Sequence, residues 1–220
     1  AYERFLQYVK VYTTSDPESA SHPTTARQLD LGRMLVAQLE ELGLKDARLD
    51  EHGYVYATLP ATPGCEQTVG LGFIAHMDTA PGTSGENVNP QIHENYDGGD
   101  VVLPATGAVL KPAEFPFLSE MKGQTLITTD GSTLLGADDK AGVAEIMTMV
   151  ERLIREGRPH GKICIGFTPD EEVGQGADLF DVDGFGAAYA YTVDGDDVGE
   201  ISYENFNAAA AAIKIHGLSV

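Results

Sequence analysis

Apolar side chains recur at helical spacing in two segments near the start of the chain. The segment from Tyr2 to about Tyr12 and the segment from Thr24 to Leu42 both repeat apolar residues with the period of an amphipathic helix. Gly43 follows the second segment directly, and glycine is common just past the end of a helix. We therefore expect two helices to open the domain.

Shorter apolar patterns predict strands further along the chain. Residues 47–59 alternate between polar and apolar and predict a strand pair that turns at His52 and Gly53. The apolar runs at 70–76, 162–168 and 187–193 are too short for helices and are bounded by glycine or charged residues. We expect each of these runs to form a buried strand.

A strand, a glycine-rich turn and a long helix are predicted between these runs. The strand is QTLITTD at 124–130, and the helix runs from about Lys140 to Glu156 with an apolar face. We interpret the three together as a crossover unit. Strands that alternate with helices in this way predict an α/β fold, with a mostly parallel or mixed sheet flanked by helices.

Two regions depart from this alternation. Residues from Gly82 to about Gly123 are rich in Gly, Pro, Asn and Asp, and so long a connection predicts an ordered insertion beside the site. At the other end, the strand-like GEISYE at 199–204 is followed by a second alternating run. We therefore divide the chain at Asn207, with one domain at 1–206 and the first strand of a second domain at 207–220.

Charge and cysteine content narrow the class of protein. The 34 acidic residues exceed the 14 basic ones, giving a net charge of -20 that would repel nucleic acid and anionic membranes. Cys65 and Cys164 form no disulfide framework, and Cys164 lies in an apolar run. The sequence shows no signal peptide and no apolar run long enough to span a bilayer. We expect a cytoplasmic protein.

Acidic and imidazole groups follow the ends of the predicted strands. Because ligands bind at the carboxyl ends of strands in open α/β sheets, groups that are distant in sequence meet there. One histidine with several carboxylates suits zinc, with cobalt or manganese as substitutes. The groups are His76 with Asp78, Asp138 with Asp139, Glu171 with Glu172, and Asp194.

Each group also has an interpretation without a metal. His76 and Asp78 could lie in a surface turn, and Asp194 could be a turn residue. One aspartate of the adjacent pair could cap the following helix, which leaves the second to be explained, for example as a ligand that bridges two metal ions. Glu171 and Glu172 could form a solvated turn, or one could bind metal while the other acts as a general base. The metal interpretation depends on all four groups together.

Five motifs together resemble the peptidase T branch of the di-zinc metallopeptidase family, which also includes carboxypeptidase G and aminoacylase. The motifs are HMDTAP, GQTLITTDG, TLLGADDKAGVAEIM, GFTPDEEVGQGAD and YTVDGD. The short HMD and DEE pieces are shared across the family. The segments NVNPQIHENYDGGD and SYENFNAAAA are specific to the peptidase T branch.

The resemblance implies a role for each site residue. His76 and Asp194 would bind one zinc ion, Glu172 would bind a second, and Asp138 would bridge the two. Asp78 would orient His76, and the Asp138–Asp139 peptide bond would be cis. Glu171 would be the general base for the attacking water.

The resemblance also implies a substrate, and it implies parts of the enzyme that this sequence does not contain. The expected reaction removes the N-terminal residue from tripeptides. Members of the family continue beyond the catalytic segment with an α+β lid domain, which is used for substrate binding and for forming a homodimer. They also have a last histidine ligand that this sequence lacks. His216 lies in the alternating run and is not expected to bind metal. Two alternatives stay open: a related di-zinc deacylase or dipeptidase, and a non-catalytic module in which the carboxylates bind calcium or cap helices. His76 argues against calcium, which prefers oxygen ligands.

Overall fold

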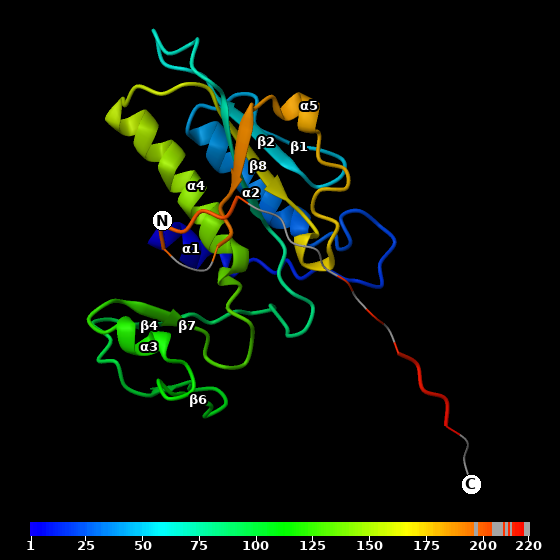
Figure 1. Cartoon of the computed structure of the whole chain (residues 1–220), viewed down its shortest axis with the longest axis vertical. Coiled ribbons are helices and arrows are strands. Elements are labelled where there is room, and N and C mark those ends of the chain that lie inside the picture. The colour runs from blue at the N-terminus through cyan, green and yellow to red at the C-terminus, as the bar shows by residue number, and fades with distance from the viewer. Residues whose placement is uncertain (196–197, 204–208, 210, 212, 218–220) are drawn as a thin grey trace.

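A five-stranded mixed sheet forms the centre of the protein in a computed structural model that describes residues 1–195, 198–203, 209, 211 and 213–217 (Figure 1). Its strand order is β1-β2-β8-β3-β9. β1 and β2 pair antiparallel with each other, and β2 pairs antiparallel with β8, whereas β3, β8 and β9 run parallel. The strands are β1 (Arg48–Leu49), β2 (Val55–Leu59), β3 (Leu71–His76), β8 (Ile163–Thr168) and β9 (Tyr189–Thr192). The predicted α/β fold and strand pair are confirmed.

The two faces of the sheet follow the alternation of the sequence. In β2 and β8 the odd-numbered residues, such as Val55 and Ile165, point into the main core. The even-numbered Tyr56 and Cys164 point to the opposite face, where they pack with Phe185. Both faces of these central strands are therefore buried, as their nearly continuous apolar runs predict.

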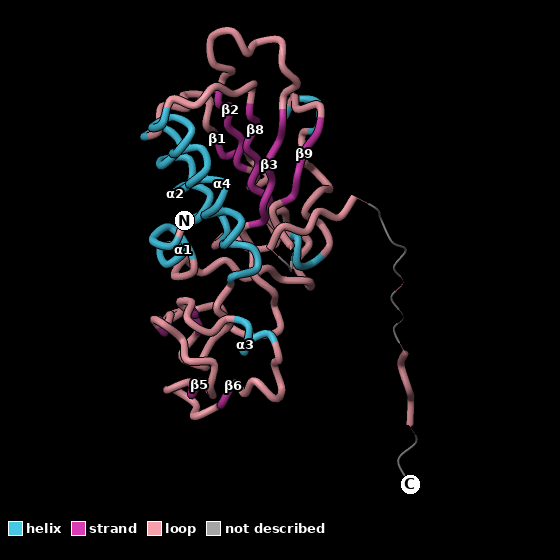
Figure 2. The backbone as a smooth tube through the Cα atoms, turned by 60° about the vertical axis from the view of Figure 1, so that its left-hand side comes forward, coloured by secondary structure: helices cyan, strands magenta, loops and turns pink. Residues whose placement is uncertain are grey.

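Three helices cover one face of the sheet. They are α1 (Tyr2–Tyr8), α2 (Gln28–Glu41) and α4 (Ala137–Glu156), and Figure 2 shows them together on one side of the strands. Their apolar residues join the main core. The short helix α5 (Val182–Phe185) contributes Phe185 to the opposite face. The carboxyl ends of β3, β8 and β9 are left at one edge of this layered structure.

Both N-terminal helices are shorter than the sequence predicts. The first ends at Tyr8, after which hydrogen bonds between residues three positions apart replace the helical bonds between residues four positions apart. The second begins at Gln28 because the polar groups of Thr24 and Thr25 bond elsewhere: Thr24 donates to Asp170, and the Thr25 hydroxyl donates to the Thr14 carbonyl.

The predicted insertion is ordered and forms a small lobe. Helix α3 (Phe117–Glu120) and the hairpin of β5 (Val101–Val102) and β6 (Val109–Leu110) belong to it. Tyr96, Val101, Leu103 and Leu118 give the lobe its own buried cluster. In Figure 1 the lobe lies beside the end of α4 at which the helix begins.

The prediction of a crossover unit is wrong in one respect. The predicted strand is present as β7 (Leu126–Thr128), but it pairs with β4 (Gln91–His93) in a separate two-stranded sheet. It does not join the central sheet. The strand is short and only partly buried: Leu126 packs against the buried cluster of the lobe, whereas Ile127 packs against the main core, which α4 then joins.

The C-terminal strand predictions are not supported by the described residues. Residues 199–203 of the predicted strand GEISYE are described and contain no strand, and residues 209, 211 and 213–217 form neither helix nor strand. Asn207 lies outside the described residues, so the division of the chain at this point stays a prediction. Among the described helices, none has the length and apolar content needed to cross a membrane.

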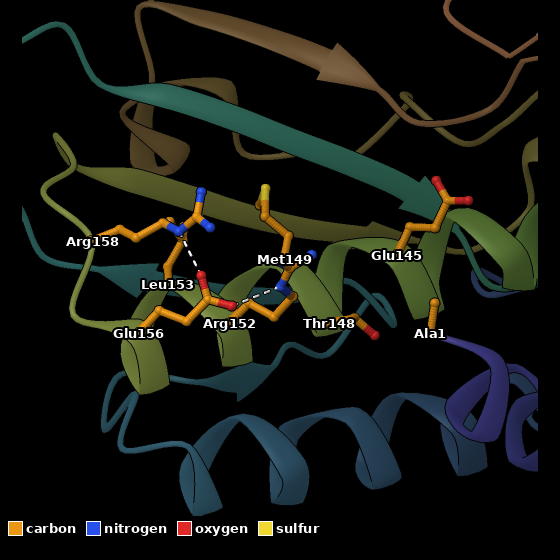
Figure 3. Close-up of a pocket in the computed structure, with 8 residues that line it drawn as sticks. All are labelled: Ala1, Glu145, Thr148, Met149, Arg152, Leu153, Glu156 and Arg158. Carbon is orange, nitrogen blue, oxygen red and sulfur yellow. Dashed lines mark hydrogen bonds and ion pairs between the residues drawn. The ribbon is translucent and has the colours of Figure 1, made fainter.

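The exposed side of α4 carries a shallow groove of about 310 Å³ (Figure 3). Met149 and Leu153 line it, and Glu156 pairs with both Arg152 and Arg158 at one end. None of the residues predicted to form the site lines this groove. The chemistry therefore has to be sought at the strand ends instead.

Candidate metal centre

His76 is the buried centre of the candidate site. It is the last residue of β3 and is only 2% exposed. Its Nε2 lies 2.8 Å from Asp138 Oδ1, 3.7 Å from Asp194 Oδ2 and 3.8 Å from Glu171 Oε2. Three carboxylates from three separate segments therefore converge on one imidazole nitrogen, as the parallel strand ends predict.

The other imidazole nitrogen is held by Asp78. His76 Nδ1 lies 3.0 Å from the Asp78 carbonyl oxygen and 3.4 Å from Asp78 Oδ1. A proton on Nδ1 therefore has an acceptor, which directs the lone pair of Nε2 toward the carboxylates. This is the arrangement in which a histidine can bind a metal ion through Nε2.

Asp78 also fixes the acidic turn after β8. Its fully buried carboxylate accepts the backbone N–H of Glu171 at 3.0 Å and that of Glu172 at 3.2 Å. Both glutamates lie in the short 3₁₀ helix η1 (Glu171–Val173). One buried aspartate thus ties the end of β3 to the turn that follows β8.

The two adjacent aspartates have different surroundings. The peptide bond between Asp138 and Asp139 is cis, as the resemblance implies, and regular helical geometry begins only at Lys140. Asp139 accepts the Gly142 N–H at 3.1 Å and the His76 N–H at 3.2 Å. The helix-capping interpretation therefore fits Asp139. The side chain of Asp138 is 71% exposed and faces His76.

The end of β9 is brought to the site by close contact with α4. A β-carbon on Gly142 would stand 1.9 Å from the Val193 carbonyl oxygen, so only glycine fits at this position. The N–H of Val193 donates to the Ile74 carbonyl at 2.7 Å, which ties the strand end to β3. Asp194 follows directly and takes its place from these two constraints.

Asp170 precedes the two glutamates but points away from the cluster. It is fully buried and has a φ of 57°. Its carboxylate accepts hydrogen bonds from Thr24 and from Gln28. The sequence presented Asp170, Glu171 and Glu172 as one acidic triplet, and the structure separates the first from the other two.

The concentrated negative charge changes the protonation of the site. Burial alone would lower the pKa of His76, but the hydrogen bond and charge of Asp78, with the charge of Asp139 and the hydrogen bond of Asp138, raise it to about 10. Burial, aided by Asp194, raises the pKa of Asp139 to about 8. In the absence of a metal ion, a proton on His76 therefore offsets part of the negative charge.

The two glutamates have raised pKa values for the same reasons. Burial is the largest cause for both. The pKa of Glu171 is raised further by the charges of Asp194, Asp78 and Asp138, and that of Glu172 by Asp138, Asp78 and Glu171. A carboxylate with a raised pKa is a better proton acceptor, as a general base requires.

Lys140 is a buried lysine whose burial the sequence did not predict. It is 1% exposed, and its Nζ donates to the Val11 carbonyl at 2.7 Å. Burial lowers its pKa to about 7, and the charge of Asp78 opposes that shift. Its position in the acidic ADDK segment gave no sign that it would be buried.

The donor set fits a metal ion. One donor atom from each of His76, Asp138 and Asp194 lies within 4.8 Å of the others. An imidazole nitrogen with two carboxylate oxygens is a combination that zinc accepts. Glu172 is outside this group of three, although the charge of Asp138 is among the causes of its raised pKa.

Sequence comparison gives a consistent result over nearly the whole chain. A peptidase T of Clostridium acetobutylicum is 59% identical across 99% of this chain, and one of Clostridium perfringens is 57% identical across all of it. The chain is a homologue of peptidase T. It covers 54% of each of these two proteins, so it spans about half the length of the curated relatives it matches. No protein-family model matches the chain.

Solved structures agree with the relation to peptidase T. The crystal structure of the aminopeptidase PepT of Bacillus cereus is 26% identical, with a TM-score of 0.64, and the match covers 89% of this chain and 43% of that one. A tripeptidase of Staphylococcus aureus shares the fold at a TM-score of 0.62 and 24% identity, over 89% of this chain and 43% of its own. The mixed sheet with flanking helices is therefore that of known peptidases.

Proposed function

We propose that this chain carries the larger part of the active site of a zinc-dependent aminopeptidase that removes the N-terminal residue from tripeptides. The observation that supports this most strongly is the convergence of Asp138, Asp194 and Glu171 on His76 Nε2. The tripeptide substrate comes from the family resemblance, and the similarity to the aminopeptidase PepT of Bacillus cereus supports cleavage at the N-terminal residue. Since the chain spans about half their length, the reaction is proposed for the natural protein that contains it.

His76 and Asp194 would hold one zinc ion, Glu172 a second, and Asp138 would lie between the two. Zinc bound at such a site polarises a carbonyl group and makes water more acidic. Cobalt or manganese could take its place. The remaining ligand and a lid used for dimerisation, both implied by the family resemblance, belong to what the chain does not cover.

Glu171 is the proposed general base. Its carboxylate is 52% exposed, so water can reach it, and burial raises its pKa, which makes it a better proton acceptor. It would take a proton from the attacking water and later deliver it to the nitrogen of the scissile bond, which leaves as the new amino terminus of the remaining dipeptide. Asp78 holds the backbone of Glu171 and so fixes where the base stands.

A cytoplasmic location is proposed from the cysteines. Cys65 and Cys164 are both free thiols, and Cys164 is buried in β8. Structural disulfides are rare in reducing compartments, and free buried thiols are common there.

The test is peptide hydrolysis by the natural protein with and without Glu171→Gln. Loss of a general base is expected to lower kcat by about 10²- to 10⁴-fold while zinc stays bound. Glu120→Gln, an exposed glutamate in the lobe, is the control. Full activity of Glu171→Gln would contradict the assignment.

The substrate panel separates the proposal from its alternatives. It contains a tripeptide, the same tripeptide with an acetylated amine, a dipeptide and an N-acyl amino acid. An aminopeptidase selective for tripeptides is expected to cleave only the first. Preference for the dipeptide or the acyl amino acid would identify a dipeptidase or deacylase instead.

A further inference from the structure

Asp170 is a buried carboxylate with a place in the site but no place among the metal ligands. It lies between the end of β8 and the turn that carries Glu171 and Glu172. We propose that Asp170 is a positioning residue, which with Thr24 and Gln28 fixes this turn for catalysis. The inference rests on the proposed function, since it gives Glu171 and Glu172 their roles.

The carboxylate of Asp170 has a donor for each oxygen. Oδ1 accepts the Thr24 hydroxyl at 2.5 Å and the Gln28 amide at 2.6 Å. Oδ2 accepts the Thr24 N–H at 2.8 Å and lies 3.5 Å from His22 Nδ1. The buried charge is therefore compensated by hydrogen bonds, and no oxygen is directed toward the metal cluster.

The backbone of Asp170 is held by the same partner. Its N–H donates to Gln28 Oε1 at 3.1 Å, so Gln28 bonds both the side chain and the main chain of Asp170. The Asp170 carbonyl accepts the Gln175 N–H at 2.9 Å, which closes the turn. These contacts hold Asp170 at a φ of 57°, a value uncommon for residues other than glycine.

The turn is thus fixed from two sides. On one side, Asp78 binds the N–H groups of Glu171 and Glu172 from the end of β3. On the other side, Asp170, the residue before Glu171, is hydrogen-bonded to Thr24 in the segment before α2. The side chain of Glu171 is half exposed, and its Oε2 lies 3.8 Å from His76 Nε2, beyond hydrogen-bonding distance. Its position therefore depends on the backbone that Asp78 and Asp170 hold.

Exchanging the carboxylate of Asp170 and the amide of Gln28 between the two positions gives a direct test of the proposal. In Asp170→Asn an amide nitrogen faces the donor groups of Thr24 or Gln28, and in Gln28→Glu two carboxylates face each other. In the double variant, Asp170→Asn with Gln28→Glu, the hydrogen bond between the two side chains reverses direction while the total charge is unchanged. Comparison of the single variants with the double variant therefore distinguishes the effect of losing the hydrogen bond from the effect of replacing either residue.

The measurements are kcat, KM and zinc affinity of the natural protein. Each single variant is expected to lower kcat at least about tenfold with KM within about threefold, and to weaken zinc binding by about tenfold, because Glu171 and Glu172 move together. The double variant is expected to return to within about threefold of wild type. Asp178→Asn, an exposed aspartate nearby, is the control.

Two outcomes would overturn the inference while leaving the proposed function intact: a folded Asp170→Asn protein with wild-type kcat and zinc affinity, or a folded double variant as impaired as Asp170→Asn. If Asp170→Asn does not fold, Thr24→Val removes the hydroxyl bond to Asp170, together with the acceptor for the Asp16 N–H and the Gln28 amide, and keeps the bond from the Thr24 N–H. An unchanged kcat in that variant also overturns the inference. A wild-type protein that neither binds zinc nor cleaves tripeptides overturns the proposed function and this inference with it.

Discussion

Replacing Gly142 by alanine tests whether the contact between α4 and β9 sets the metal site. The new β-carbon would stand 1.9 Å from the Val193 carbonyl oxygen and 2.4 Å from Asp139 Oδ1. To reach 3.0 Å from Val193, the two segments must separate by about 1.1 Å. Since the Val193 N–H is bonded to Ile74, this movement has to be taken up at Asp194 or at the start of α4, where Asp138 lies.

The displacement is large on the scale of metal coordination. Metal-ligand distances are maintained within about 0.2 Å, so a shift of about 1 Å removes a ligand from its place. We expect zinc affinity to fall by about 10- to 100-fold, which corresponds to about 1.4–2.7 kcal/mol. Overpacking costs about 1–3 kcal/mol of stability, and the better helix propensity of alanine recovers at most about 1 kcal/mol of it.

Calorimetric zinc titration and thermal unfolding of the natural protein measure both effects. Gly82→Ala is the matched control, because no heavy atom lies within 4 Å of the added carbon and its backbone φ is not positive. We expect the control to bind zinc as the wild type does. A Gly142→Ala protein with unchanged zinc affinity and unchanged melting temperature would refute the claim that this contact places Asp194 and Asp138.

Three further predictions follow from the site and the core. Asp78→Asn replaces one acceptor oxygen by a donor, so the N–H of Glu171 or Glu172 loses its partner; zinc affinity measured by calorimetry is expected to fall about 10- to 100-fold, and an unchanged value would exclude this role. The pKa of His76, about 10, means that it is protonated at neutral pH, and a metal ligand has to be neutral. Zinc binding should therefore release at least about one proton, and the affinity should rise about tenfold per pH unit from about pH 6 to 9; titrations in buffers of different ionisation enthalpy would show no release if the reasoning fails. Leu35→Ala in the main core is expected to lower the free energy of unfolding by about 2–5 kcal/mol in denaturant melts, against less than about 0.5 kcal/mol for the partly exposed Leu179→Ala; equal losses would contradict the assigned core.

The parts of the fold predicted correctly are those with a strong local pattern. The runs ending at His76 and Thr168 are largely buried strands, as predicted. The run ending at Thr192 is also a strand, parallel to β3, but the prediction that it is buried is wrong, because all four residues of β9 are exposed at the edge of the sheet. The parallel pairing of the three strands follows from the helices between them. Parallel strands bring their carboxyl ends to one edge, so the convergence of His76 with Asp194 could be expected without a structure.

Other features depend on contacts between distant segments and leave no local signal. QTLITTD has the pattern of a strand, but nothing within it indicates that it pairs with β4 in the lobe. Asp170 looks like a third member of the acidic triplet until Gln28 and Thr24 are seen to surround it. The burial of Lys140 is likewise a property of the packed structure.

Zinc titration of the natural protein beside its Asp138→Ala variant tests the metal site most directly. Asp138 is the residue on which both proposed zinc positions depend, and its Oδ1 lies 2.8 Å from His76 Nε2. Asp100→Ala, which removes an exposed carboxylate in the lobe, is the control. We predict tight zinc binding by the wild type and the control and its loss in Asp138→Ala. Wild-type affinity in Asp138→Ala, or no zinc binding by any of the three, would contradict the proposed metal centre.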